Sequence, residues 1–260
     1  MIPGLLLGLL TLIATFLFVS PPAWFPAAIS GAAVAYDRQF QFTLRITGFI
    51  FIAAQILLAF VVVRYRESNR PVLYTHGNGK VEMAWTIATS LIFMGLALSG
   101  TRIWAGIHFT PPPADAVTIE VYAQQFAWSF RYPGPDGKFG RTDIRFIDDA
   151  AQNPVGLDDR DPAGRDDILS ASLKVPVGKE ITLVLRARDV IHDFFVRELR
   201  LKQDIVPGMD IPYRFRADKT GKYEIACAEL CGLGHSQMRG VMEVMSQSEF
   251  DRWKRTQARK

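Results

Sequence analysis

Cysteine is scarce in this sequence: its 260 residues contain two, and both lie in one short segment near the C-terminal end. Two cysteines form at most one disulfide, which excludes the small secreted folds that depend on several. Histidine is also rare, with four residues, and no Cys-x-x-Cys-His run is present. The chain therefore has neither a covalently attached c-type haem nor a histidine set for another haem.

Charge is missing from long parts of the first hundred residues. Residues 2–36 have no charged side chain, and residues 46–63 and 83–101 are uncharged and apolar. A helix needs about 20 residues to cross the hydrocarbon core of a bilayer. We predict a transmembrane anchor over residues 1–110, with two or three spans at about 2–20, 46–63 and 83–101.

The first apolar segment has two readings, a retained helix or a cleaved signal peptide. It lacks the basic start of a signal peptide, and no small-residue cleavage site follows closely. Ala33-Val34-Ala35 would fit a cleavage site but lies far from the apolar core. We favour a retained helix.

The basic excess of the chain lies beside the membrane. The net charge is +4 over residues 1–110, −3 over 111–247 and +3 over 248–260. Arg64, Arg66, Arg70 and Lys80 surround the connection between the second and third apolar segments, which indicates a cytoplasmic loop. Residues after the third span then lie on the outer, periplasmic side of a bacterial cytoplasmic membrane. This distribution predicts contact with lipid rather than with nucleic acid.

Alternation of apolar and polar residues begins at Val117. Many short strands with Gly and Pro between them predict an all-β sandwich with Greek-key connections over residues 111–247. The Asp-rich segment 148–170 lacks EF-hand spacing and is predicted to be a solvated loop. Ser246 and Glu249 predict a capping box before a basic C-terminal helix or tail, residues 248–260. The candidate strands are 117–123, 125–132, 143–147, 172–176, 181–187, 211–216, 222–226 and 240–245.

The two cysteines stand among other metal-binding side chains. Cys227, Cys231, His235 and Met238 lie within twelve residues. Thiolate and thioether are soft donors, and this favours an electron-transfer copper site over zinc. One face of a helix would give the same spacing, but the two glycines between these residues cost about 1 kcal/mol each in a helix. A structural disulfide would leave His235 and Met238 unexplained.

A copper site needs more nitrogen than one imidazole supplies. His76 and His108 flank the third apolar span, where a solvated or interfacial role is typical. His192 follows Asp189-Val190-Ile191 inside the polar half of the chain. We therefore expect His192 to be the second imidazole, contributed by a separate strand or loop.

These residues resemble a known family. The run Cys-x-Glu-x-Cys-x-x-x-His-x-x-Met, preceded by Asp-Val-Ile-His, is similar to the CuA domain of subunit II of haem-copper respiratory oxidases. Residues 201–208 resemble the stretch that follows the family's first histidine ligand, and residues 82–86 resemble the opening of its last transmembrane helix. The resemblance covers roughly residues 44 to 246, and it implies a cupredoxin-like sandwich.

The resemblance implies a ligand set for a dinuclear copper centre. Cys227 and Cys231 would bridge two coppers, and His192 and His235 would each bind one. The remaining ligands would be the thioether of Met238 and the backbone carbonyl of Glu229. By the same resemblance, the Glu229 side chain would help to bind magnesium at the contact with subunit I. Glu82 has two readings: an ordinary interfacial carboxylate at a helix start, or, by the resemblance, a residue for proton uptake near a channel of that subunit.

The run Gln125-Phe126-Ala127-Trp128 departs from the family pattern Gln-Trp-x-Trp, whose first Trp is the expected entry point for electrons. Phe126 replaces that Trp, while Trp128 is retained. On a strand, Phe126, Trp128, Phe130 and Tyr132 share one face, and Arg131 lies on the other. We expect most of this face to be sandwich core.

The resemblance therefore implies an oxidoreductase and translocase subunit of a proton-pumping terminal oxidase. It would accept electrons from a cytochrome c and pass them to haem in subunit I, with subunit III as a further partner and oxygen reduction in subunit I. One alternative is a membrane-anchored copper chaperone or thiol oxidoreductase with a Cys-x-x-x-Cys motif. Another is the CuA subunit of a nitric oxide reductase. A subunit II without copper, as in quinol oxidases, does not fit because the ligands persist.

Overall fold

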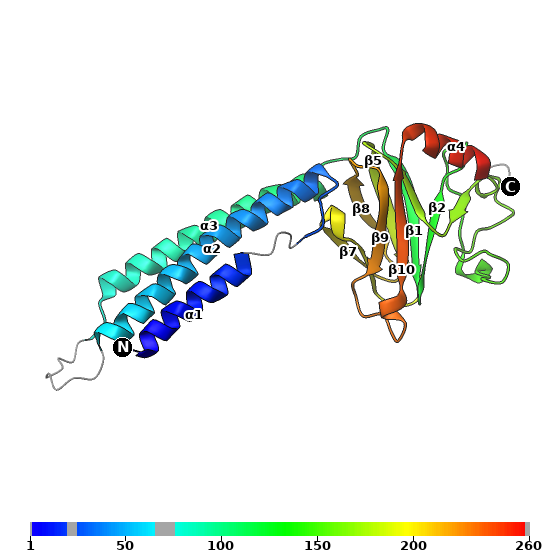
Figure 1. Ribbon diagram of the computed structural model, residues 1–260. Helices are drawn as coiled ribbons and strands as arrows, with labels where there is room; N and C mark the ends of the chain where they lie inside the picture. The colour runs from blue at the N-terminus through cyan, green and yellow to red at the C-terminus, as the bar shows by residue number, and fades with distance from the viewer. Residues whose placement is uncertain (1, 20–24, 66–75, 258–260) are drawn as a thin grey trace. The chain divides into compact units, whose positions relative to one another are not determined.

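The computed structural model describes residues 2–19, 25–65 and 76–257. The chain forms two compact units (Figure 1). One unit is helical and contains most of the first 105 residues; the other contains residues 25–34 and the chain from Gly106 onward. We describe each unit separately.

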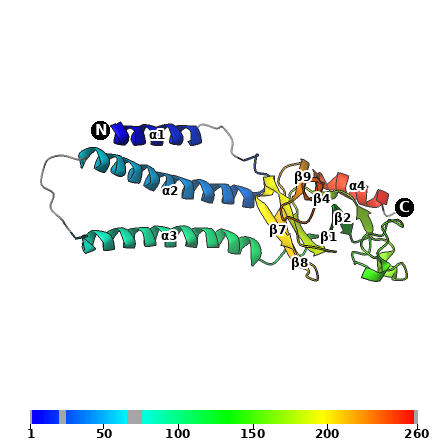
Figure 2. The ribbon, with the colours of Figure 1, turned by 90° about the horizontal axis from the view of Figure 1, so that it is seen from below.

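The helical unit consists of α1 (Ile2–Val19), α2 (Gly31–Arg64) and α3 (Gly79–His108), although the first turn of α2 and the last turn of α3 belong to the other unit. Helices α2 and α3 are long and apolar enough to cross a membrane, and they run in opposite directions (Figure 2). Their apolar side chains are largely exposed, as expected for surfaces that face lipid. The segments predicted at 46–63 and 83–101 lie inside these two helices.

Polar contacts fix the ends and the pairing of the long helices. Asn78 caps α3, because its Oδ1 accepts hydrogen bonds from the N–H groups of Lys80 and Val81 at 3.1 and 3.3 Å. Between the helices, the Ser99 hydroxyl donates to Oε1 of Gln39 at 2.6 Å. The basic loop residues Arg66 and Arg70 lie outside the described residues.

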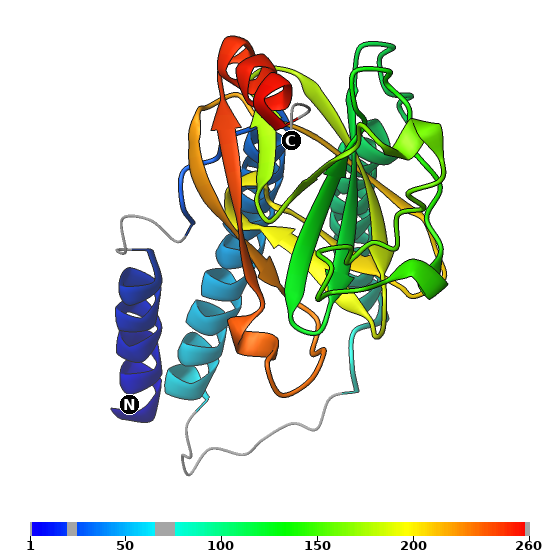
Figure 3. The ribbon, with the colours of Figure 1, turned by 90° about the vertical axis from the view of Figure 1, so that its right-hand side faces the viewer.

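The second unit is a sandwich of two five-stranded sheets (Figure 3). One sheet has the order β3-β2-β1-β5-β8 and the other β4-β10-β9-β6-β7. The pairs β1–β5 and β4–β10 are parallel, and the other neighbours are antiparallel. This confirms the predicted all-β sandwich. The strands are β1 (Val117–Gln124), β2 (Ala127–Tyr132), β3 (Ile168–Ser170), β4 (Leu173–Pro176), β5 (Glu180–Ala187), β6 (His192–Val196), β7 (Leu201–Ile205), β8 (Ile211–Arg216), β9 (Gly221–Cys227) and β10 (Arg239–Met245).

One predicted strand is wrong and three strands were not predicted. Residues 143–147 form the 3₁₀ turn η1 (Ile144–Phe146), because Asp143 caps it by accepting from the Arg145 N–H. Strand β3 has three residues, too few to show a period. Strands β6 and β7 contain polar residues that obscure the apolar alternation. Strand β6 nevertheless lies between β9 and β7, and His192 and Asp193 are fully buried there.

The aromatic face of β2 is core, as expected for three of its four residues. Trp128, Phe130 and Tyr132 are buried between the sheets. Phe126 instead lies in the turn before β2 and is 38% exposed, so it does not share their environment.

Part of the opposite face of β2 is covered by the Asp-rich segment. Most of residues 148–170 are exposed or half-buried, as predicted for a solvated loop, but the Asp167 side chain is buried. Arg131 is 1% exposed, and its guanidinium donates to Glu120 at 2.8 Å and to Asp167 at 3.0 Å. Asp167 also accepts from the Gly140 N–H at 3.0 Å. A buried charge of this kind is stable only with such partners. The pairing therefore anchors the loop to the sheet.

Helix α4 (Gln247–Gln257) begins with the predicted capping box. Ser246 N donates to the Glu249 carboxylate at 2.9 Å, and Glu249 N donates to the Ser246 hydroxyl at 3.3 Å. The helix packs through Phe250 and Trp253 against Tyr132, with ring centroids 6.3 and 4.8 Å apart. This confirms the cap and shows why the tail is a helix.

A short N-terminal segment belongs to the sandwich unit. Ile29 is buried; its N–H donates to the Glu198 carbonyl at 3.2 Å, and its carbonyl accepts from Asp218 N at 2.6 Å. Asp218 also accepts from the Gly31 N–H at 3.0 Å, at the start of α2. Ala33, within the candidate cleavage site, is buried in the first turns of α2.

Candidate metal centre

Three secondary-structure elements bring the predicted metal ligands together at one end of the sandwich. His192 is the first residue of β6, and Cys227 is the last residue of the neighbouring β9. The loop from β9 to β10 then carries Cys231, His235 and Met238, with a single 3₁₀ turn, η4 (His235–Gln237). The paired strands fix the first two ligands, and the loop folds the others back over them.

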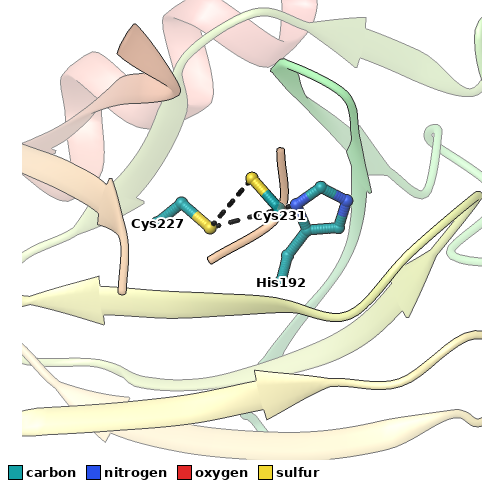
Figure 4. A group of neighbouring side chains, drawn as sticks. All are labelled: His192, Cys227 and Cys231. Atoms are coloured by element: carbon teal, nitrogen blue, oxygen red, sulfur yellow. Dashed lines mark hydrogen bonds between the residues drawn. The ribbon is translucent and has the colours of Figure 1, made fainter. Parts of the chain in front are cut away.

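The sulfur and nitrogen atoms of three buried side chains face one another (Figure 4). The Sγ atoms of Cys227 and Cys231 are 3.8 Å apart, and Nδ1 of His192 is 3.9 Å from Sγ of Cys227. A disulfide has a sulfur–sulfur distance of about 2.05 Å. The two cysteines are therefore free thiols, and with His192 they form the group of metal-binding side chains found within the described residues.

The other three predicted donors surround the same sulfur pair. Nδ1 of His235 lies 3.7 Å from Sγ of Cys231, and Sδ of Met238 lies 3.8 Å from it. The backbone oxygen of Glu229 is 3.2 Å from Sγ of Cys227. Each thiol thus has one imidazole and one weak donor nearby. The Glu229 side chain itself is exposed.

The loop conformation excludes the helical reading of the motif. Gly232 has a φ of +135°, which favours glycine. A Cβ atom at Gly234 would lie 2.4 Å from the Phe126 ring, so this ring packs directly on the loop. The glycines let the loop turn sharply and let Phe126 cover it.

Two residues outside the predicted set hold the ligands in place. Asp189 Oδ1 accepts from Nε2 of His192 at 2.8 Å, which leaves Nδ1 directed at the sulfur atoms. Gln125 donates from its main chain to Asp189 Oδ2 and from Nε2 to the Cys231 carbonyl, both at 2.7 Å. The sequence places Asp189 three residues before His192, but nothing in it indicates that Gln125 meets either loop.

Burial and neighbouring charges shape the electrostatics of this end of the sandwich. Burial and the neighbouring thiol of Cys227 raise the pKa of Cys231 to about 11. The thiol is therefore protonated at neutral pH, and a metal ion must displace its proton. Burial tends to raise the pKa of Asp189, but hydrogen bonds from Gln125 N and His192 hold it below its usual range. Next to His192, burial and Asp204 raise the pKa of Asp193 to about 7.

The two candidate electron-entry residues differ in environment. Trp128 is buried and meets the His192 ring edge-on, with centroids 6.4 Å apart. Phe126 is partly exposed and packs on the ligand loop at Gly234. Both therefore lie beside the donor set, one inside the sandwich and one at its surface. Glu82 lies in the first turn of α3, exposed, in the helical unit.

Comparison with known proteins identifies the family. Residues 117–245 match the family described as cytochrome C oxidase subunit II, periplasmic domain, and residues 21–103 match its transmembrane domain. The chain belongs to the cytochrome c oxidase subunit II family. An alternative cytochrome c oxidase subunit 2 from Bradyrhizobium diazoefficiens is 38% identical over 253 residues, covering 95% of this chain and 89% of that protein.

Other relatives agree with this membership. Cytochrome c oxidase subunit 2 of Thermostichus vulcanus is 31% identical and covers 88% of this chain and 77% of its own length. A crystal structure of the periplasmic domain of subunit II of cytochrome oxidase from Bradyrhizobium japonicum is 31% identical, with a TM-score of 0.42, covering 58% of this chain and 98% of that one. Because it belongs to this family, this subunit II is a membrane-anchored chain with a cupredoxin-like periplasmic domain, and it works with a catalytic partner subunit in an oxidoreductase complex.

The donor set fits the copper of this family. Two thiols, two imidazoles and a thioether combine soft donors with nitrogen, a set that suits copper. A structural zinc site would use four donors from Cys, His or carboxylate and would leave Met238 without a purpose. The chemistry of the side chains therefore supports a copper site.

Proposed function

We propose that this chain is the electron-transfer subunit of a proton-pumping terminal oxidase, with a dinuclear copper centre in its periplasmic domain. Cys227 and Cys231 would hold both coppers, His192 and His235 would each bind one, and the Met238 thioether and the Glu229 carbonyl would complete the set. Support comes from one observation above all: the two Sγ atoms lie 3.8 Å apart with an imidazole beside each. When bound, the metal pair would accept and release one electron at a time.

The side chains would exclude water from the metal centre and hold its donor atoms in fixed positions. His192, Cys227, Cys231 and Met238 are buried, so water is largely kept from the donors. The main chain also closes the loop, because Cys227 N donates to the Met238 carbonyl and Ala228 N to the Asp193 carbonyl, both at 3.2 Å. Donors held in this way move little when the charge of the centre changes, which favours rapid electron transfer.

The electron would enter from a cytochrome c and leave for haem in subunit I. Phe126 is the proposed entry residue, because it is exposed and its ring touches the ligand loop. Trp128 is the second candidate, since its ring lies against His192. We propose exit on the side of His235, the partly exposed imidazole of the pair.

Further roles of the family are proposals for this chain. The exposed Glu229 side chain would help to bind magnesium at the contact with subunit I, and Glu82, at the start of α3, would serve proton uptake there. Subunit III would complete the assembly. We propose a multi-pass protein of the bacterial cytoplasmic membrane, with residues 1–110 as anchor, 111–247 as the periplasmic domain and 248–260 as the basic tail.

Copper analysis and electron paramagnetic resonance of the full-length chain in detergent test this proposal. We expect two coppers per chain and a mixed-valence hyperfine pattern from one electron shared by both nuclei. Cys227→Ser removes one bridge and abolishes that pattern, whereas Ser236→Ala, in the same loop, keeps it. Zinc, a cystine or an unchanged pattern in Cys227→Ser would reject the dinuclear site.

The two alternatives predict different results. A copper chaperone or thiol oxidoreductase would be colourless and would show a reversible dithiol; the β-sandwich disfavours this reading, because such proteins usually have an α/β domain. A nitric oxide reductase subunit would carry the same copper ligands. Purified complex that consumes oxygen but not nitric oxide supports the oxidase, and the reverse result supports the reductase.

A further inference from the structure

The turn between β1 and β2 contacts two separate parts of the ligand set. Gln125, in this turn, donates from its main-chain N–H to Oδ2 of Asp189 at 2.7 Å. Its side-chain Nε2 donates to the carbonyl of Cys231, also at 2.7 Å. Asp189 in turn accepts from Nε2 of His192 at 2.8 Å. Gln125 therefore links the histidine before β6 to the cysteine in the β9–β10 loop.

The side-chain amide of Gln125 occupies space beside Gly232 of the β9–β10 loop, where any other residue would place a side chain. Gly232 follows Cys231, and a Cβ atom there would lie 2.9 Å from Nε2 of Gln125. Gly232 also has a positive φ, so the Cys231 carbonyl is turned toward the β1–β2 turn. The amide and the glycine together set the direction of this carbonyl, and with it the backbone that carries the Cys231 thiol.

We propose that Gln125 is a positioning residue for electron transfer at this centre, an inference that rests on the proposed function. By holding Asp189 and the Cys231 carbonyl together, Gln125 keeps His192 and Cys231 at a constant separation in both oxidation states. The reaction moves one electron and makes or breaks no covalent bond. Its rate therefore depends on how little the donors rearrange, and a loosened Cys231 slows it.

The test uses two substitutions in the full-length, copper-loaded chain in detergent. Gln125→Glu keeps the size of the side chain but replaces the donor with an oxygen that repels the Cys231 carbonyl. Gln125→Ala removes the side chain and leaves the main-chain hydrogen bond to Asp189 in place. Gln124→Ala is the matched control, because the Gln124 side chain accepts from Arg188 at 2.6 Å instead.

We expect both Gln125 variants to retain copper, because the thiols and imidazoles remain. Their mixed-valence hyperfine pattern and reduction potential should change, and electron exchange with a small soluble donor should slow about tenfold, the usual effect of losing a contact that orients a ligand. A purely structural role would lower the unfolding midpoint without changing the spectrum or the potential. The Gln124→Ala control should match the unsubstituted chain in every measurement.

Two results overturn the inference alone. One is a Gln125→Glu chain with unchanged spectrum, potential and exchange rate, and the other is an equal change in Gln124→Ala. A different result, the lack of a mixed-valence spectrum in the unsubstituted chain, rejects the proposed function and the inference with it.

Discussion

Asp189 accepts a hydrogen bond from Nε2 of His192 at 2.8 Å, and this contact decides which nitrogen of the ring faces the sulfur atoms. The other nitrogen, Nδ1, lies 3.9 Å from Sγ of Cys227. A carboxylate behind a metal-binding histidine fixes the ring and makes it a stronger donor. The first prediction follows from the charge of this carboxylate.

Asp189→Asn should keep copper bound and raise the reduction potential. The amide oxygen can still accept from Nε2, so the ring keeps its orientation. The lost negative charge stabilised the more positive, oxidised centre, so reduction becomes easier. Redox titration of the full-length chain measures the shift. A lower potential in this variant would contradict the assigned direction of the effect.

Met238→Leu should also leave copper bound and change its potential. Met238 is buried, and Leu fills nearly the same volume without a thioether. A weak axial donor tunes a copper centre, while thiolates and imidazoles hold it. Metal content and redox titration check both parts. Loss of copper from the variant would show that Met238 holds the metal.

Phe126→Trp should speed the oxidation of a cytochrome c by the assembled complex. Position 126 is exposed and its ring packs on the ligand loop, so an indole there would offer a larger aromatic contact to a donor. The second-order rate constant at fixed ionic strength is the measurement. An unchanged rate constant would place electron entry at another residue.

Arg131→Ala should destabilise the periplasmic domain by about 3–5 kcal/mol, because it leaves the buried Asp167 carboxylate without its cation. Glu120 loses the same guanidinium but keeps its ion pair with Arg186 at 2.7 Å. Urea unfolding followed by tryptophan fluorescence measures the change. Arg145→Ala is the control, since Arg145 pairs with Asp143 on the exposed surface. The urea midpoint of unfolding should be unchanged in this variant. A midpoint for Arg131→Ala equal to that of the control would mean that the loop is not anchored through this residue.

Acid should weaken the domain partly through Glu243. Burial tends to raise the pKa of Glu243, but Lys174, at 3.0 Å, and Lys222 hold this pKa below its usual value of 4.5. A depressed pKa gives stability that is present above the unfolded value and is lost as the pH falls through the folded value. Unfolding midpoints should therefore decline below about pH 4.5 less steeply in Glu243→Gln. If the unfolding midpoint fell equally steeply with pH in Glu243→Gln and in the unsubstituted chain, Glu243 would not contribute.

The candidate donor set was predictable because most of its residues lie in one short segment. Cys227, Cys231, His235 and Met238 follow one another closely, and their chemistry alone points to copper. The sandwich was also predictable, since alternation along strands such as β5 reports a buried face directly. In such cases the local sequence carries the information that the fold uses.

The contacts that orient the ligands were not predictable, because they join segments distant in sequence. Gln125 meets Asp189 and Cys231 only after β1, β6 and β9 have come together. The same holds for Arg131, whose buried partner Asp167 lies 36 residues further along the chain. The prediction of a strand at 143–147 was wrong for a local reason, because Asp143 caps a turn there.

The attachment of residues 25–34 to the sandwich makes this segment part of the unit that carries the candidate metal centre. The Asp218 N–H donates to the Ile29 carbonyl, so the segment that precedes α2 is held to the sandwich. Cleavage before Phe25 would leave this attachment intact, whereas cleavage after Ala35 would remove it.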